Sequence, residues 1–272
     1  MKSCVTISLV PSLQGGPWIL WDDLTTSCRK ANELGFDAVE LFTEGPSAGD
    51  PGELGTLLEE NGLALGAVGT GAGKVLHGWS LTDPGAEIRQ KAKRFISEMI
   101  TFGAMFDAPA IIGSMQGSHG NGVSRGDALK YLTEALEELG EIASKASVKL
   151  IYEPLNRYET NLFNRFNEAA EFLDGLSTMA VTLLADLFHM NIEETCLADA
   201  IRTAGSHIGH VHFVDSNRRA AGMGHIDYQP VMAALAEIGY DGYLCAEALP
   251  YPDSQQAAEQ TINCYRQCTL SD

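Results

Sequence analysis

Short apolar, β-branched segments alternate with longer segments of helical spacing from one end of the sequence to the other. Short apolar runs between turn residues predict buried strands, and apolar residues every three or four positions predict helices. The predicted strands are Cys4 to Val10, Ala38 to Phe42, Ala64 to Thr70, Ala108 to Met115, Val148 to Leu155, Val181 to Phe188, Ile208 to Val214 and Tyr243 to Leu249. The predicted helices are Leu20 to Gly35, Pro51 to about Asn61, Ile88 to Phe106, Asp127 to Ala146, Asn164 to Leu176, Thr195 to Gly205, Tyr228 to Gly239 and Ser254 to about Leu270.

Strict alternation of strands and helices predicts an α/β fold with parallel strands. Right-handed crossovers with short returns favour closure of eight such units into a (β/α)8 TIM barrel. A doubly wound open sheet is the alternative, but it usually carries a Gly-x-Gly-x-x-Gly turn after the first strand, which Ser12 to Pro17 does not supply. No linker or low-complexity segment interrupts the pattern, so we expect residues 1–272 to form a single TIM-barrel domain.

The chain is acidic, with 36 Asp and Glu against 18 Lys and Arg and a formal charge of −18. Nucleic-acid affinity depends largely on Lys and Arg that displace counterions from phosphates. We therefore expect no nucleic-acid substrate. No stretch approaches the length of apolar sequence that spans a bilayer, so no membrane segment is expected.

Cysteine usage and the first residues favour a cytoplasmic protein. The six cysteines form no C-x-x-C pair, which favours reduced thiols over disulfides or a zinc site. The opening MKSCVTISLV is not followed by a small-residue cleavage site. We interpret it as the first strand and not as a signal peptide.

Two glycine-rich stretches are predicted as loops. The stretch from Gly69 to Gly78 contains GTGAGK but lacks the phosphate-loop spacing, because Val75 follows the Lys. The stretch from Gln116 to Val123 contains three glycines and is typical of a mobile lid over a site.

Four consecutive predicted strands end in residues that can bind a metal or transfer a proton. These residues are Glu153, Asp186, His212 and Glu247. The carboxyl ends of barrel strands surround one mouth, so residues distant in sequence meet there. Side chains alternate between the two faces of a strand, so Glu153 points inward together with Ile151. One acidic strand end is usually a solvated rim residue, but four consecutive strands predict a shared site.

Three carboxylates in a half-buried mouth repel one another, and protonation would require large upward shifts in pKa. A divalent cation removes this conflict. Three carboxylates and one imidazole are too rich in oxygen and charge for a structural zinc site, and they suit Mn²⁺, with Mg²⁺ or Co²⁺ as alternatives. The sequence therefore predicts a metal site formed by the four strand ends.

Further polar residues are predicted at the same rim. Glu159 follows the fifth strand, His189 the sixth and Arg218 the seventh, and we expect them to contact the substrate. His210 is expected one layer deeper than His212, and Glu40 is expected to point inward as a buried partner of the site.

These segments resemble those of the ketose 3-epimerases of the D-tagatose 3-epimerase type, within the xylose-isomerase-like barrel superfamily of sugar isomerases and epimerases. The matching segments are EPLNRYETN from Glu153, ADLFHMNIEE from Ala185, GHVHFVDSNR from Gly209 and AEALP from Ala246. The resemblance implies that Glu153, Asp186, His212 and Glu247 bind Mn²⁺, that Glu153 and Glu247 are also the catalytic pair, and that Glu159, His189 and Arg218 bind the sugar.

The resemblance also implies a reaction. A metal that holds the carbonyl O2 and hydroxyl O3 of a ketose acidifies the proton on C3 and stabilises the enediolate. One glutamate removes the proton and the other returns one on the opposite face, which inverts C3. Related barrels with the same ligands include hydroxypyruvate or oxo-tetronate isomerases and inosose dehydratases, and these alternatives stay open. Relatives in this family imply a homodimer or homotetramer.

Overall fold

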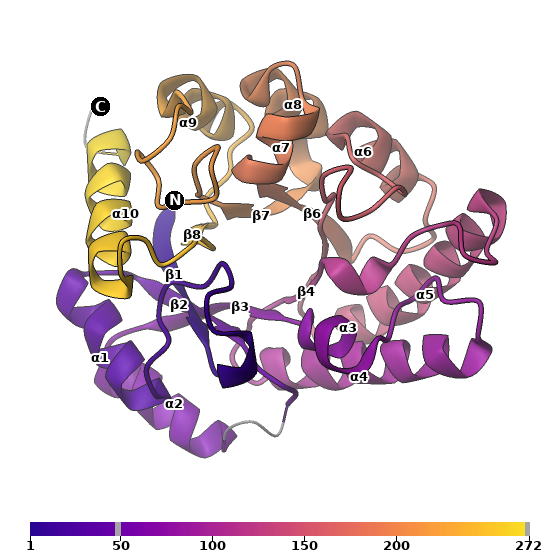
Figure 1. The fold of residues 1–272 in the computed structure, drawn as a ribbon, viewed down its shortest axis with the longest axis horizontal. Coiled ribbons are helices and arrows are strands. Elements are labelled where there is room, and N and C mark those ends of the chain that lie inside the picture. Colours follow the sequence, from indigo (N-terminus) through magenta and orange to yellow (C-terminus); the bar gives the residue numbers. More distant parts are fainter. Residues whose placement is uncertain (47–49, 270–272) are drawn as a thin grey trace.

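The computed structural model describes residues 1–46 and 50–269, in which eight parallel strands pair in chain order and close into a barrel (Figure 1). The strands are β1 (Lys2–Ser8), β2 (Ala38–Phe42), β3 (Ala64–Gly69), β4 (Ala110–Ile112), β5 (Leu150–Tyr152), β6 (Val181–Asp186), β7 (Ile208–His212) and β8 (Tyr243–Ala246). The helices are α1 (Leu24–Leu34), α2 (Pro51–Glu60), α3 (Ala72–His77), α4 (Ala86–Ala104), α5 (Arg125–Lys145), α6 (Phe166–Asp174), α7 (Leu187–Glu193), α8 (Leu197–Ala204), α9 (Tyr228–Glu237) and α10 (Ser254–Thr269). Short 3₁₀ helices are η1 (Pro11–Leu13), η2 (Ser114–Gln116) and η3 (Gly205–His207). The predicted TIM barrel is confirmed.

The prediction of eight helices in strict alternation is wrong, because the described residues contain two additional α-helices. The predicted glycine-rich loop contains α3, which ends where Gly78 adopts the left-handed conformation with φ 72°. The predicted sixth strand was extended to Phe188, but β6 ends at Asp186 and α7 begins at the next residue. The segments that form α3 and α7 are glycine-rich or apolar, and each contains only one or two helical turns. Such a short segment does not repeat its apolar residues often enough for a helical period to be recognised in the sequence.

β2 has the predicted ends, Ala38–Phe42, and the other predicted elements are present with shifted ends. β5 stops at Tyr152, two residues before Pro154, which has no N–H to donate to a neighbouring strand. β8 stops at Ala246, so Glu247 lies just beyond its strand. Leu270, to which the last helix was extended, lies outside the described residues.

Residues that favour the beginning or the end of a helix lie at the observed ends of α1 and α2. Asp50 precedes α2 and accepts the N–H of Gly52, with Pro51 at the first helical position. Gly35 ends α1 in the left-handed conformation with φ 82°, which a glycine adopts without steric strain.

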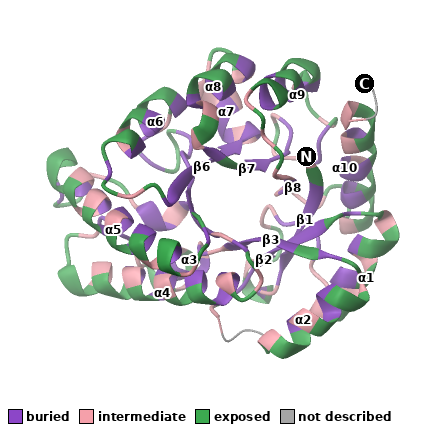
Figure 2. Ribbon diagram, turned by 180° about the vertical axis from the view of Figure 1, so that it is seen from behind, coloured by how far each residue is buried: buried purple, intermediate pink, exposed green. Residues whose placement is uncertain are grey.

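The core consists of two shells on either side of the strands. The outer shell packs strand residues such as Leu150 and Tyr152 against the helices, and Figure 2 shows buried residues along the strands and on parts of the surrounding helices. Inside the barrel, two smaller apolar clusters fill the space below the mouth. They consist of Ala67, Ile111, Ile151 and Leu184 in one cluster and Cys4, Ala38 and Cys245 in the other. The barrel interior beneath the site is therefore filled by packed side chains. Ile151 points inward, as predicted.

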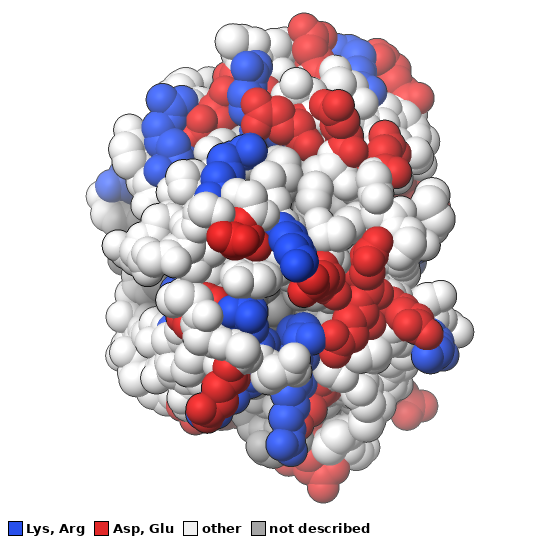
Figure 3. Space-filling model, turned by 90° about the vertical axis from the view of Figure 1, so that its right-hand side faces the viewer, with Lys and Arg blue, Asp and Glu red and all other residues white. Residues whose placement is uncertain are grey.

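The surface carries charges of both signs. On the face drawn in Figure 3, Lys and Arg side chains lie next to Asp and Glu side chains. Some ion pairs of the described residues join helical positions one turn apart, such as Arg94 with Glu98 and Lys145 with Glu141. Among the described residues, none of the helices has the length and apolar character needed to cross a bilayer.

Candidate functional site

Four side chains from neighbouring strands meet at the carboxyl end of the barrel. Glu153 follows β5, Asp186 ends β6, His212 ends β7 and Glu247 follows β8. One ligand atom from each residue lies within 4.8 Å of the ligand atoms of the other three. The first three are buried and Glu247 is partly exposed. The structure thus brings together all four residues that the sequence singled out as metal ligands.

Asp186 is oriented by the helix that it begins. Its Oδ1 atom accepts the backbone N–H groups of Phe188 at 2.8 Å and His189 at 3.0 Å, which caps α7. Its Oδ2 atom is left facing Nδ1 of His212 at 3.1 Å. The additional helix α7 therefore fixes this carboxylate in the cluster.

His212 presents its two ring nitrogens to different groups. The Nδ1 atom faces the cluster, 3.8 Å from Oε1 of Glu153 and 3.6 Å from Oε2 of Glu247. The Nε2 atom faces Glu40, whose Oε1 is 3.4 Å away. Glu40 also contacts Nε2 of His210 at 2.8 Å and is buried, as the sequence predicted.

The cluster has an excess of negative charge that its own residues do not neutralise. Burial, together with the carboxylates of Glu247 and Asp186, raises the pKa of Glu153 well above its usual value. Burial likewise raises the pKa of Glu247. Burial also acts to raise the pKa of Asp186, but the imidazoles of His189 and His212 outweigh it and hold that pKa below its usual value.

A divalent cation fits this arrangement. Oε1 of Glu153 is buried without a hydrogen-bond partner, although a buried carboxylate oxygen normally has one. A bound cation would supply positive charge to that oxygen and would lower the pKa values of the surrounding carboxyl groups. The donor set of three carboxylates and one imidazole is suited to Mn²⁺ or Mg²⁺ more than to a structural zinc ion.

His189 points a hydrogen-bond donor toward Glu153. Its Nδ1 atom accepts the backbone N–H of Asn156 at 3.2 Å, so the ring proton of the neutral imidazole is on Nε2. Nε2 lies 3.8 Å from Oε1 of Glu153 and is buried without a hydrogen-bond partner. Burial lowers the pKa of His189, which favours this neutral form.

Arg218 lies at the rim between two carboxylates. Its guanidinium group contacts Oε2 of Glu247 at 3.2 Å and Oε1 of Glu159 at 3.4 Å, and it lies over the ring of Phe188. Of the three rim residues predicted from the sequence, His189 and Arg218 therefore lie beside the four-residue cluster, and Glu159 contacts both of them.

The conformation of Arg218 depends on Asp215, which sequence reasoning missed. Arg218 has a φ of 60°, an unusual value for a residue other than glycine. Its N–H donates to the carbonyl of Asp215, and the fully buried Asp215 carboxylate accepts N–H groups of Ser216, Gly222 and Ile226. The position of Asp215 directly after the predicted strand Ile208 to Val214 is the signal that could have identified it.

The site opens into a cavity of about 220 Å³. Its lining includes Glu153, Glu247 and Arg218. Trp18 and Phe42, whose stacked rings have centroids 4.0 Å apart, line it as well. Sequence reasoning missed both aromatic residues. The alternation of β2 contained a signal for Phe42, since it lies two positions after the inward-facing Glu40, whereas Trp18 lies in a loop without periodicity.

The predicted lid from Gln116 to Val123 is tied to the loop after β5. Gln116 is fully buried and donates to the carbonyl of Glu153 at 2.8 Å, so its assignment to a flexible polar loop is wrong. Further along, the backbone N–H of His119 donates to Asn161 at 2.8 Å. Movement of this segment stays a prediction.

Comparisons with known proteins agree with this geometry. Residues 28–268 match the family model described as xylose isomerase-like TIM barrel. A D-psicose 3-epimerase of Ruminiclostridium cellulolyticum is 31% identical over 226 residues, which cover 80% of this chain and 76% of the relative. A 3-dehydro-D-guloside 4-epimerase of Escherichia coli is 30% identical over 140 residues, or 51% of this chain and 53% of the relative.

The fold also matches solved structures. A crystal structure of D-psicose 3-epimerase with D-tagatose from Clostridium cellulolyticum superimposes with a TM-score of 0.82 at 24% identity, covering 99% of both chains. The chain therefore belongs to the xylose isomerase-like TIM barrel family.

Proposed function

We propose that this protein is a metal-dependent isomerase that epimerises C3 of a ketose. The observation that carries the proposal is the convergence of Glu153, Asp186, His212 and Glu247, whose ligand atoms lie within 4.8 Å of one another. All of these residues except Asp186 line the cavity. The similarity to D-psicose 3-epimerase over most of both chains supports a ketose as the substrate.

We further propose that these four residues hold one divalent cation and that it is Mn²⁺. Their donor set and the unpartnered oxygen of Glu153 support this assignment. When bound, the cation would polarise the substrate carbonyl and orient the adjacent hydroxyl group.

Glu153 and Glu247 are the proposed proton-transfer pair. They come from strands β5 and β8 and line the same cavity. In one direction, one carboxylate removes the proton from C3 and leaves an enediolate, and the other glutamate delivers a proton to the opposite face. Each residue serves as acid or base according to the direction of the reaction.

Glu159, His189 and Arg218 are the proposed contacts for the O1 and O2 end of the sugar. The Nε2–H of His189 and the guanidinium of Arg218 are donors beside the cluster, where negative charge develops on O2. Glu159, at 37% side-chain exposure, lies 3.4 Å from Arg218 and can accept from a sugar hydroxyl.

A second candidate is C4 epimerisation of a 3-keto sugar, which the 30% identity to 3-dehydro-D-guloside 4-epimerase favours. The chemistry is the same, because the inverted carbon is again adjacent to the carbonyl. The two candidates differ in which carbon lies between Glu153 and Glu247.

Isotope incorporation in D₂O tests these proposals. The Mn²⁺-loaded protein is incubated with a panel of free ketoses and 3-keto glycosides, and the products are examined by NMR. Deuterium at C3 of an epimerised ketose supports the first proposal, and deuterium at C4 of a 3-keto glycoside supports the second. An aldose product or a dehydrated product would contradict both and would favour an aldose-ketose isomerase or an inosose-type dehydratase.

We also propose that residues 1–272 act as one domain in the cytoplasm, with a sugar and not a nucleic acid as ligand. Six free cysteines support a reducing compartment. The expected assembly is a homodimer or homotetramer, and light scattering of the purified protein measures it.

A further inference from the structure

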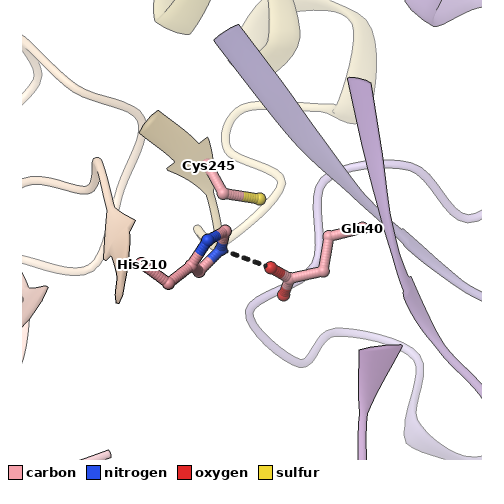
Figure 4. A group of neighbouring side chains, drawn as sticks. All are labelled: Glu40, His210 and Cys245. Carbon is pink, nitrogen blue, oxygen red and sulfur yellow. Dashed lines mark hydrogen bonds and ion pairs between the residues drawn. The ribbon is translucent and has the colours of Figure 1, made fainter. Parts of the chain in front are cut away.

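A second group of buried polar residues lies directly beneath the metal-ligand cluster. Figure 4 shows Glu40, from β2, and His210, from β7, pointing toward one another inside the barrel, with Cys245 of β8 beside them. Oε2 of Glu40 lies 2.8 Å from Nε2 of His210. Its Oε1 lies 3.4 Å from Nε2 of His212. One carboxylate therefore faces both imidazoles of β7.

Glu40 reaches His210 and His212 across the barrel and not along a neighbouring strand. β2 pairs with β1 and β3, whereas β7 pairs with β6 and β8. The Glu40 side chain spans the interior of the barrel and restrains the ring of His212 on the side away from the metal-ligand cluster. The apolar residues inside the barrel pack around these side chains. All three side chains are almost completely buried, with exposures of 4% for Glu40 and 1% for each histidine.

The arrangement determines which nitrogen of His212 is free to bind a cation. Carboxylates face both ring nitrogens: Oδ2 of Asp186 lies 3.1 Å from Nδ1, and Oε1 of Glu40 lies 3.4 Å from Nε2, which is buried without a hydrogen-bond partner. A carboxylate only accepts hydrogen bonds, and a nitrogen that binds a cation must give up its proton, so the nitrogen that keeps its proton when the cluster is loaded is the one that faces Glu40. That nitrogen is Nε2, and the lone pair available to a ligand is then on Nδ1. Nδ1 is the atom that faces Asp186, Glu153 and Glu247.

We propose that Glu40 is a positioning residue for the metal site: it accepts the Nε2–H of His212 and thereby directs Nδ1 toward the cation. This inference rests on the proposed metal-dependent function. His210 donates to the other oxygen of the same carboxylate and fixes its orientation. Partners of this kind, which orient a ligand without touching the metal, contribute about 10- to 100-fold to metal affinity.

The same residues allow an alternative. Glu40, His210 and Cys245 offer ligand atoms within 4.8 Å of one another and could hold a second cation. The observations favour the positioning role, because the carboxylate and His210 already form a 2.8 Å hydrogen bond with each other.

Mn²⁺ affinity tests the proposal independently of catalysis. The free Mn²⁺ signal in electron paramagnetic resonance is titrated with wild-type protein and with Glu40→Gln, which retains the shape but accepts through one oxygen only. We expect one equivalent of Mn²⁺ in both proteins and about 10- to 100-fold weaker binding by the variant.

Two control variants separate positioning from charge and from a second site. Glu159→Gln removes one carboxylate from the rim without contacting His212, and its Mn²⁺ affinity should stay close to that of the wild type. Cys245→Ala should leave one equivalent bound with unchanged affinity. Equal affinities of wild type and Glu40→Gln, or a second equivalent that Cys245→Ala abolishes, would overturn the proposal.

The tautomer of His212 can be tested in wild-type protein. No substitution is needed, so misfolding of a variant cannot affect the result. In wild-type protein labelled with ¹⁵N-histidine and loaded with diamagnetic Mg²⁺, the imidazole whose Nδ1 resonance responds to the metal should carry its proton on Nε2. A metal-responsive imidazole protonated on Nδ1 would overturn the proposal.

A protein that binds one cation through this tautomer but epimerises none of the sugars would contradict only the proposed function. An epimerase in which Glu40→Gln binds Mn²⁺ normally would contradict only this inference.

Discussion

Nδ1 of His212 lies 3.1 Å from Oδ2 of Asp186, although the two residues are 26 positions apart in the sequence. The other oxygen of Asp186 caps α7, the helix that carries His189 and places its Nε2 atom 3.8 Å from Oε1 of Glu153. One aspartate thus links the proposed metal-binding cluster to the helix that carries His189. Substitutions at Asp186 and at other residues of the site should show which residues contribute to metal binding, which to proton transfer and which to the stability of the fold.

Mn²⁺ should stabilise the fold through the four-residue cluster. At a concentration of about 100 times its Kd, a ligand that binds only the native state adds about 2.7 kcal/mol to the free energy of unfolding. Thermal unfolding should therefore shift upward with Mn²⁺ and return on chelation. Asp186→Asn keeps the oxygen that caps α7 but removes a charged ligand, so its melting temperature should respond little to Mn²⁺. An equal Mn²⁺ response in this variant would contradict the assigned ligand set.

Glu247→Gln should reduce turnover by about 10²- to 10⁴-fold, the usual contribution of a positioned acid or base. Glu153 stays intact in this variant and can still act on one face of the substrate. In D₂O we therefore expect exchange of the C3 proton in one epimer without inversion. Mn²⁺ content measured on the same sample distinguishes lost proton transfer from lost metal. Turnover near the wild-type level would exclude Glu247 as a proton-transfer group.

Arg218→Met should lower kcat by about 10²- to 10³-fold, as expected for loss of one donor to a developing oxyanion. The neighbouring Arg219 provides a matched control, because its guanidinium lies over the ring of Tyr251, 3.7 Å from the centroid, and not between the site carboxylates. Steady-state kinetics of Arg219→Met should resemble those of the wild type. Similar losses in both variants would indicate a general effect of positive charge at the rim.

Asp215 should make stability depend on pH in the acid range. Burial acts to raise its pKa, but backbone N–H groups of the loop outweigh it and lower the pKa below its ordinary value of 3.8. A carboxyl group with a lowered pKa stabilises the native state above its unfolded pKa, and this contribution disappears as the pH falls through the folded value.

Asp215→Asn should therefore lower the free energy of unfolding at pH 7 by about 1–3 kcal/mol, because one amide group cannot satisfy all of the N–H donors. Urea unfolding of both proteins at pH 7 and near pH 3 measures the difference, which should shrink at the lower pH. A difference that grows on acidification would contradict the assignment.

The sequence by itself determined the class of fold and the main members of the site. Strand and helix periodicity repeated along the chain, and a parallel barrel must bring the carboxyl ends of its strands together, so Glu153, Asp186, His212 and Glu247 could be placed at one mouth. The inward position of Glu40 also followed from alternation along its strand.

Only the tertiary structure decided how these groups are oriented and what surrounds them. The short helix α7, the buried Gln116, the Asp215 loop and the Trp18–Phe42 stack depend on contacts between residues far apart in the chain. The spacing of apolar residues indicates which face of a helix or strand is buried, because that face is buried along the whole element. Hydrogen-bond partners and ring orientation depend instead on particular atoms brought together by closure of the barrel, and local sequence does not contain that information.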